Sequence, residues 1–341
     1  MIKFLWGGLV DYFRNYGKRF FVITGGIVSA LFLILVINID PSTNLILFII
    51  FLIFCSLGLG ILDVAADAWA IEITITKEHG KISGAMLAGQ SMGYSFSAFL
   101  IPMFSQNLGY SNSFLIFGSI LLFFLIFPLI SKEKIVIRKN IKIISKLFNE
   151  FKNKSIFPIA IFLPISMISV GIITIFMPIY SKTELDLDLI RIGYIMGFSP
   201  IIFVIGTILG GIITDKYGRK ISIYFFMNIS GLFIFSIIFI NNWENIAIVY
   251  WIISFLHGGY QPSIMAIAMD ITNPEISATE FSIYASLLNL GEMGSTAMAG
   301  TLIVFFGFTK VILFSVWFIG IALFILYFIN EKVKIQINKS N

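Results

Sequence analysis

Ten long, mostly apolar runs, nine of them uncharged and one with the single charge of Glu292, set the strongest limit on how this chain can fold. Each run approaches or exceeds the roughly 18 to 20 residues that a helix needs to cross a bilayer. The runs lack strict alternation and exceed the strands of about 10 residues that build membrane barrels. The sequence therefore predicts an all-α integral membrane protein. The ten predicted spans are 20–38, 44–62, 82–105, 112–131, 156–181, 192–213, 221–241, 245–269, 281–306 and 311–330.

The composition excludes most other classes of protein. Hydrophobic residues make up 58% of the chain and charged residues 12%, against about 45 to 50% and about 25% in soluble proteins. The one cysteine, Cys55, has no partner for a disulfide, and His79 and His257 alone cannot form an intramembrane Cys/His zinc cluster. The chain contains no P-loop or hydrolase motif. We therefore expect neither an enzyme nor a cofactor or metal site.

The basic residues predict the orientation in a cell membrane. Nineteen of the 23 Lys and Arg residues lie in one set of alternate loops, in the linker and in the tail. This side should be cytoplasmic by the positive-inside rule. The net charge of +5 is thereby explained without a nucleic-acid partner. One loop on this side, from Asp270 to Glu280, carries three acids and no base.

A basic segment divides the chain. Ser131 to Ser155 holds eight basic residues and two acids, and we interpret it as a solvated linker that touches anionic lipid headgroups. The predicted domains are an N-terminal bundle at 1–131, the linker at 132–155, a six-helix bundle at 156–330 and a cytoplasmic tail at 331–341.

A short glycine, aspartate and basic motif occurs twice, once near the N-terminus and once past the middle of the chain. Laying the first copy onto the second also lays the first half onto the last four spans of the second half, which leaves the spans 156–181 and 192–213 unmatched. The fold is thus four spans plus six, with residues 1–10 as a helix stub. One helix and most of a second would be missing before Met1, so the start is misassigned, the chain is a fragment, or it is a natural ten-span variant. The motif residues are Gly7, Asp11, Gly17, Lys18 and Arg19, and then Gly211, Asp215, Gly218, Arg219 and Lys220.

The second copy resembles the loop signature G-x-x-x-D-x-x-G-R-K of the major facilitator superfamily. This resemblance implies two pseudo-symmetric helical bundles and transport by alternating access. In that family the motif serves gating and conformational stability, so Asp11 and Asp215 are assigned to gating. The missing segment would correspond to the first helix and most of the second of the family fold.

A narrower resemblance is carried by the segment from Leu62 to Ala70, which is similar to Q-D-[IV]-x-x-D-[AG]-W of the acetyl-coenzyme A transporter and muropeptide permease branch. The five residues between Asp11 and Gly17 also fit this branch. Leu62 departs from its usual Gln. Glu292 stands where muropeptide-type permeases often have Arg, which puts a sugar-peptide substrate in doubt.

Polar residues deep in the spans are candidates for binding solute and protons, because deep ionisable groups are costly in a bilayer. At about 1.5 Å per residue, Glu292 lies about 18 Å from the cytoplasmic end of its span, and His257 reaches a similar depth, so that the two side chains are expected to meet. The other predicted midplane residues are Gln261, Asn289, Gln90 and Tyr94.

A second set of acids lies toward the cytoplasmic edge and is assigned to a gate. Asp63 and Asp67 are four residues apart and share one helix face, and Asp270 follows the span 245–269. Glycines at the small-xxx-small spacing, Gly89 with Gly93 and Gly206 with Gly210, are expected to pack helices together.

The sequence thus predicts a monomeric, multi-pass secondary transporter that moves a small organic solute, with protons as the coupling ion. The alternatives are a non-transporting receptor or degenerate carrier, and a drug or sugar exporter of another branch.

Overall fold

The computed structural model describes residues 3–133, 143–152 and 156–329. All regular structure among these residues is helical. The N-terminal half contains α1 (Lys3–Tyr12), α2 (Lys18–Leu35), α3 (Leu45–Ile73), α4 (His79–Leu108), α5 (Tyr110–Phe124) and α6 (Ile126–Ile130). The C-terminal half contains α8 (Ile156–Thr183), α9 (Leu189–Tyr217), α10 (Arg219–Ser236), α11 (Trp243–Ile271), α12 (Ser277–Phe306) and α13 (Phe308–Phe328), and α7 (Ile143–Phe151) lies between the halves.

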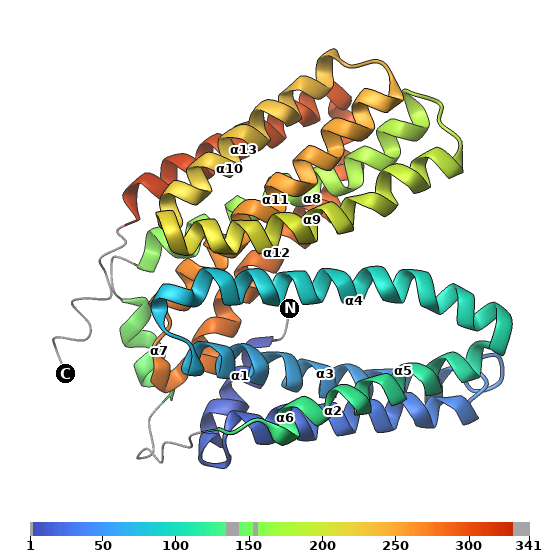
Figure 1. Cartoon of the computed structure of the whole chain (residues 1–341), viewed down its shortest axis with the longest axis vertical. Coiled ribbons are helices and arrows are strands. Elements are labelled where there is room, and N and C mark those ends of the chain that lie inside the picture. The colour runs from blue at the N-terminus through green and yellow to red at the C-terminus, as the bar shows by residue number, and fades with distance from the viewer. Residues whose placement is uncertain (1–2, 134–142, 153–155, 330–341) are drawn as a thin grey trace.

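The helices form two bundles that converge near α7 and diverge towards the other end, as Figure 1 shows. We call these the closed end and the open end. Near the closed end the bundles touch, since a Cβ on Gly84 of α4 would lie 2.5 Å from the carbonyl oxygen of Thr207 on α9.

Helices occupy all ten predicted spans. By length and composition, seven helices in the described part of the chain are apolar enough to cross a membrane. The helices α4, α11 and α12 are just as long but are not among the seven. These three carry more polar residues and contact the opposite bundle, α4 with α9 and α11, and α12 with α1 and α3. The more polar spans therefore lie where the bundles face one another.

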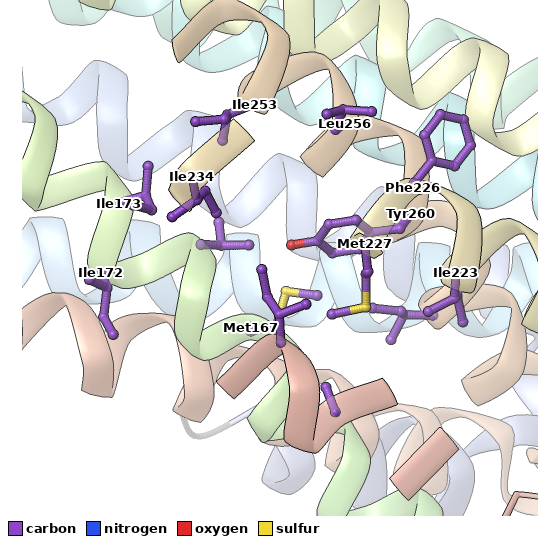
Figure 2. Packing of buried hydrophobic residues seen from close by; sticks show 14 of the residues in the cluster. Met167, Ile172, Ile173, Ile223, Phe226, Met227, Ile234, Ile253, Leu256 and Tyr260 are labelled. Atoms are coloured by element: carbon purple, nitrogen blue, oxygen red, sulfur yellow. The ribbon is translucent and has the colours of Figure 1, made fainter. Parts of the chain in front are cut away.

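The large hydrophobic core lies in the C-terminal bundle. Figure 2 shows side chains of α8, α10 and α11, among them Met167, Phe226 and Tyr260, packed together in this core. The core of the N-terminal bundle is smaller and includes Ala278 of α12, a residue of the other bundle. The N-terminal bundle is thus partly completed by its neighbour.

The two predicted glycine pairs differ in their surroundings. A Cβ on Gly206 or Gly210 would lie 2.2 Å from a carbonyl oxygen of α11, so this pair packs two helices as predicted. The prediction for Gly89 and Gly93 is wrong, because no other group of the described structure lies against them. The same spacing occurs on a covered face in α9 and on an uncovered face in α4.

Four helix-to-helix turns depend on glycine. Gly17, Gly109, Gly218 and Gly307 have φ values of +83°, +85°, +99° and +77°, a region that side chains other than glycine rarely adopt. Gly17 and Gly218 are the motif glycines that precede α2 and α10. Gly109 and Gly307 join α4 to α5 and α12 to α13.

The predicted linker contains a docked helix. In α7, the carboxylate of Glu150 accepts a hydrogen bond of 2.6 Å from the side chain of Asn273, and Lys146 forms an ion pair with Glu275. The ring of Phe151 lies 6.1 Å from that of Tyr284 on α12. The segment 143–152 is therefore anchored on the protein, while 134–142, 153–155 and the predicted tail lie outside the described residues.

Candidate functional site

Asp11 joins the two bundles at the closed end. Its buried carboxylate accepts hydrogen bonds of 2.7 Å from both the backbone N–H and the hydroxyl of Thr279, and one of 3.3 Å from the N–H of Ala278. These N–H groups belong to the first turn of α12, where helix N–H groups have no partner within the helix and favour negative charge. The ammonium of Lys18 lies 3.0 Å from the same carboxylate. We call this the Asp11 contact.

Asp215 makes the equivalent contact from the opposite bundle. Its two carboxylate oxygens accept hydrogen bonds of 2.8 Å from the backbone N–H groups of Gly80 and Lys81, in the first turn of α4. The guanidinium of Arg219 lies 3.4 Å from the same carboxylate. Each motif aspartate therefore holds the N-terminus of a helix in the other bundle. We call this second arrangement the Asp215 contact.

Each contact is close because the motif supplies a glycine one turn before the aspartate. A Cβ on Gly7 would lie 2.4 Å from the carbonyl oxygen of Ala278, and a Cβ on Gly211 would lie 2.5 Å from that of Gly80. Neither carbonyl can move cheaply, because both belong to backbone. The glycines thus permit the approach that the aspartates then hold.

Arg219 extends the Asp215 contact to Asp270. Its Nε donates a hydrogen bond of 3.1 Å to Asp270, and its guanidinium also donates to the carbonyl of Thr76. The ring Nδ1 of His79 lies 2.7 Å from the other oxygen of Asp270. Asp270, predicted as a gate residue, therefore lies in a network that spans α4, α10 and α11.

The acidic loop that departs from the positive charge around it is neutralised by its neighbours. Arg219 pairs with Asp270, and Lys146 with Glu275. Arg14 donates a hydrogen bond of 3.1 Å to the backbone carbonyl of Glu275. The acids of this loop thus receive basic groups from the linker and from both motif regions.

Glu280 is the exception, because hydrogen-bond donors but no cation reach it among the described residues. It lies in the first turn of α12, before the predicted span 281–306, and is fully buried. Its carboxylate accepts bonds of 2.8 Å from the N–H of Asn273 and 2.7 Å from the hydroxyl of Tyr284. Burial raises the pKa of Glu280 to about 7, and the charges of Glu150 and Asp11 add to this while the two hydrogen bonds oppose it.

The basic residues of the first motif are held by Glu133. Its carboxylate accepts hydrogen bonds from the N–H groups of Lys18, at 2.6 Å, and Arg19, at 3.0 Å, at the start of α2. In the second motif the ammonium of Lys220 donates to the carbonyl of Tyr327, at 3.2 Å.

A polar cluster lies farther from the closed end in the N-terminal bundle. Lys3 on α1 forms an ion pair with Asp63, and Asp67 and Tyr94 lie close enough to interact electrostatically with Lys3. Because α3 continues to Ile73, Asp63 lies 10 residues and about 15 Å inside the helix end. This is deeper than the edge of the predicted span 44–62, and the structure thereby links the predicted gate acids to Tyr94, a predicted midplane residue.

The C-terminal bundle contains a second polar cluster, with a different arrangement from the predicted one. His257 and Glu292 form no hydrogen bond or ion pair in the described structure. Instead, the ring of His257 lies 5.6 Å from that of Tyr260, and Glu292 interacts electrostatically with Tyr260. The Nε2 of His257 and the hydroxyl of Tyr260 are buried and have no hydrogen-bond partner within the described residues; the hydroxyl is visible in Figure 2. Tyr260 thus stands where the expected pair would have met.

The remaining predicted midplane residues line the more open faces of their helices. Gln90 and Tyr94 on α4 are exposed, and Gln261 on α11 and Asn289 on α12 are partly exposed. Among the described residues, the amide groups of Gln90, Gln261 and Asn289 form no hydrogen bond. Their role in binding a ligand stays a prediction.

Comparison with known proteins identifies the family. Residues 1–296 match the family model described as Major Facilitator Superfamily. The chain belongs to the major facilitator superfamily. It is 24% identical to "Putative transporter AmpG 4" of Rickettsia conorii over 367 residues, covering 98% of this chain and 86% of the relative. It is 25% identical to the "Cis,cis-muconate transport protein" of Acinetobacter baylyi over 241 residues, covering 67% of this chain and 58% of the relative.

Solved structures of the superfamily share the fold. A single-residue variant of the fucose:proton symporter FucP of E. coli superposes with a TM-score of 0.80 at 14% identity, covering 97% of this chain and 88% of that one. A FucP structure described as outward gives a TM-score of 0.79 at the same identity, covering 97% and 86%. The resemblance to the superfamily and to the branch of the AmpG-type putative transporters is thereby confirmed, as is the all-α fold.

Several residues in this major facilitator chain escaped the sequence prediction. Glu133 and Glu280 are far in sequence from the groups that they contact, so no local pattern marks them. Lys3 lies outside every predicted span. Tyr260 is three residues from His257, and its position one helical turn away was the one available signal.

Proposed function

We propose that this protein is a secondary active transporter that moves a small organic solute across the cell membrane by alternating access. The observation that carries the proposal is the pair of Asp11 and Asp215 contacts, which close one end, together with the divergence of the two bundles towards the other end in Figure 1. A bundle pair closed at one end and open at the other is one of the two states that alternating access requires.

The closed end is cytoplasmic in this proposal, because it carries the basic linker and both basic motifs. The structure then represents the outward-facing state, in line with its similarity to a FucP structure described as outward. Opening of the cytoplasmic end requires both aspartates to release the helix N-termini that they hold.

Solute and proton bind between the bundles in this proposal. The polar groups assigned to this region come from both halves: Lys3, Asp63, Asp67 and Tyr94 on one side, and Glu292, with the buried Tyr260 beside it, on the other. Glu292 is the proton carrier, and Tyr260 is its neighbour. The solute is a compound of the class moved by AmpG-type or muconate carriers, since relatives with these names match the chain.

The test is uptake by purified protein in liposomes. A thermal-shift screen over anhydro-muropeptides, acetyl-coenzyme A, peptides, sugars and cis,cis-muconate selects the solute, and uptake is then measured with and without an inward proton gradient. We expect the gradient to accelerate uptake by the wild type and to have no effect on Glu292→Gln. The variant Glu184→Gln removes an exposed carboxylate and serves as the control. Identical gradient dependence in wild type and Glu292→Gln would exclude Glu292 as the proton carrier.

The alternative is a receptor or degenerate carrier, which the uncovered middle of α4 favours. It predicts a thermal shift with a solute but no uptake under any gradient. Binding without uptake would therefore replace the proposal with this alternative.

A further inference from the structure

A buried carboxyl group at the closed end plays no part in the function proposed above. Glu280 is fully buried beside the Asp11 contact, and only the neutral N–H of Asn273 and the hydroxyl of Tyr284 donate to it. A buried carboxylate without a cation is costly, and protonation is the usual way to remove that cost. The hydroxyl of Tyr284 can accept as well as donate, so that a protonated Glu280 keeps a bond to it.

The charges around Glu280 also favour its protonated form. The ionisable groups on the elements packed at this end of α12 are Asp11 on α1, Arg14 just before α2, Lys18 on α2, Glu72 on α3, Lys146 and Glu150 on α7, and Glu275 in the preceding loop. Lys18 lies 3.0 Å from Asp11 and 3.5 Å from Glu72, Lys146 pairs with Glu275, and Arg14 donates to the backbone carbonyl of Glu275. Asp11 and Glu150 act on Glu280 as negative neighbours.

One of these neighbours, Asp11, belongs to the bundle that must separate from α12 if the closed end opens. Asp11 lies on the opposite bundle and Glu150 on the linker helix α7. When α1 leaves the N-terminus of α12, Glu280 loses the charge of Asp11 and gains water. Both changes favour the ionised carboxylate.

We propose that Glu280 is a proton-binding site that holds the cytoplasmic end closed: a proton on Glu280 favours the closed end, and its loss to the cytoplasm favours opening. The inference rests on the proposed motion of the two bundles but not on proton-coupled uptake. It places a sensor of cytoplasmic pH in the loop and helix start that the linker helix α7 covers.

The direction of the pH effect follows from the two states. In the closed state the pKa of Glu280 is about 7, above its ordinary value of 4.5, and in the open state water returns it towards that ordinary value. The closed state therefore binds the proton more tightly. Its advantage is greatest in acid, decreases as the pH rises through the interval between these values, and levels off above about pH 7.

The experiment measures the distance across the closed end in lipid nanodiscs. Spin labels are placed at Tyr12 on α1 and Tyr217 on α9, which are 73% and 54% exposed, in a Cys55→Ala background. Distance distributions are recorded from pH 5.5 to 8.5. We expect the ratio of closed to open molecules in the wild type to fall by at least about tenfold over this range.

The isosteric variant Glu280→Gln should remain closed at every pH, because its amide keeps hydrogen-bonding groups at both positions without a charge. Glu150→Gln, which preserves an acceptor for Asn273, should shift the pH-dependent change towards acid. Glu184→Gln is the matched control and should leave the curve unchanged. A second control, His79→Gln, tests the histidine that lies 2.7 Å from Asp270 in the network of the Asp215 contact.

Three results would overturn the inference: a wild-type distance that does not depend on pH, the same pH dependence in Glu280→Gln, or its complete loss in His79→Gln. Asp11→Asn serves as the reference for opening. If it opens the cytoplasmic end while pH does not, the Glu280 site fails and alternating access stands. If neither Asp11→Asn nor pH changes the distance, both proposals fail.

Discussion

The two bundles differ in how much of their interior they bury for themselves. In the most apolar stretch of 18 residues in each helix, 61% is buried in α8 of the C-terminal bundle and 17% in α3 of the N-terminal bundle. Among the described residues, the large C-terminal core takes one buried residue, Ile71 of α3, from the other bundle, whereas Ala278 of α12 is one of only seven buried residues in the N-terminal core. The Asp11 contact lies beside this borrowed residue. The Asp11 contact therefore both stabilises the N-terminal bundle and closes one end of the protein. The Asp215 contact differs, because it joins α4 to α9, a helix of the bundle that has the larger core.

The largest effect expected from this comparison is at the two aspartates. Asp11→Asn leaves the buried ammonium of Lys18 with Glu72 alone, at 3.5 Å, and breaking a buried pair costs about 3 to 5 kcal/mol. Asp215→Asn weakens charge-assisted bonds worth about 1.5 to 3 kcal/mol, but Arg219 keeps Asp270. We expect Asp11→Asn to lower the apparent melting temperature of the purified protein more than Asp215→Asn does. Equal losses, or the reverse order, would contradict the dependence of the N-terminal bundle on its neighbour.

An intermediate effect is expected at the motif glycines. Gly7→Ala and Gly211→Ala each place a methyl group against a backbone carbonyl, and overpacking of this kind costs about 1 to 3 kcal/mol. The ratio of closed to open molecules should fall about 5- to 150-fold, as measured with the spin-label pair described above. Gly8→Ala is the matched control, because its Cβ meets nothing within 4 Å. The glycine argument fails if Gly8→Ala opens the closed end as much as Gly7→Ala does.

The smallest effect is expected at Glu133, which caps the start of α2. Glu133→Gln should cost about 0.5 to 2 kcal/mol, as the loss of a helix cap does, because it weakens the bonds to the first N–H groups of α2. The measurement is the apparent melting temperature, with exposed Glu184→Gln as control. An effect no larger than that of the control would show that α2 needs no side-chain cap.

The sequence was sufficient for the helices and the repeat, but not for their partners. Run length and the motif placed the spans and aligned the two halves, because apolar length and turn chemistry are local properties. The partners of Asp11 and Asp215 are backbone N–H groups, which every sequence contains, so their position is visible only in three dimensions. The role of both residues in gating stays a prediction.

The candidate binding region shows a second limit of sequence reasoning. Depth along a helix placed His257 and Glu292 at a similar level. It does not give the direction in which each side chain points, and Tyr260 lies beside both. The glycine pairs show the same limit, since spacing does not reveal which helix face is covered. Rotation about the helix axis is set by the packing of whole helices.

The four glycine turns also record what the two halves share. Gly17 corresponds to Gly218 and Gly109 to Gly307, and the two pairs have nearly the same separation along the chain. Elsewhere the two halves differ in their side chains and in their cores. At these turns the backbone has a handedness that is unfavourable for every L-amino acid with a Cβ. Substitution of these glycines is therefore costly. The clearest sign of the duplication in this chain is therefore a set of four positions at which the backbone excludes side chains.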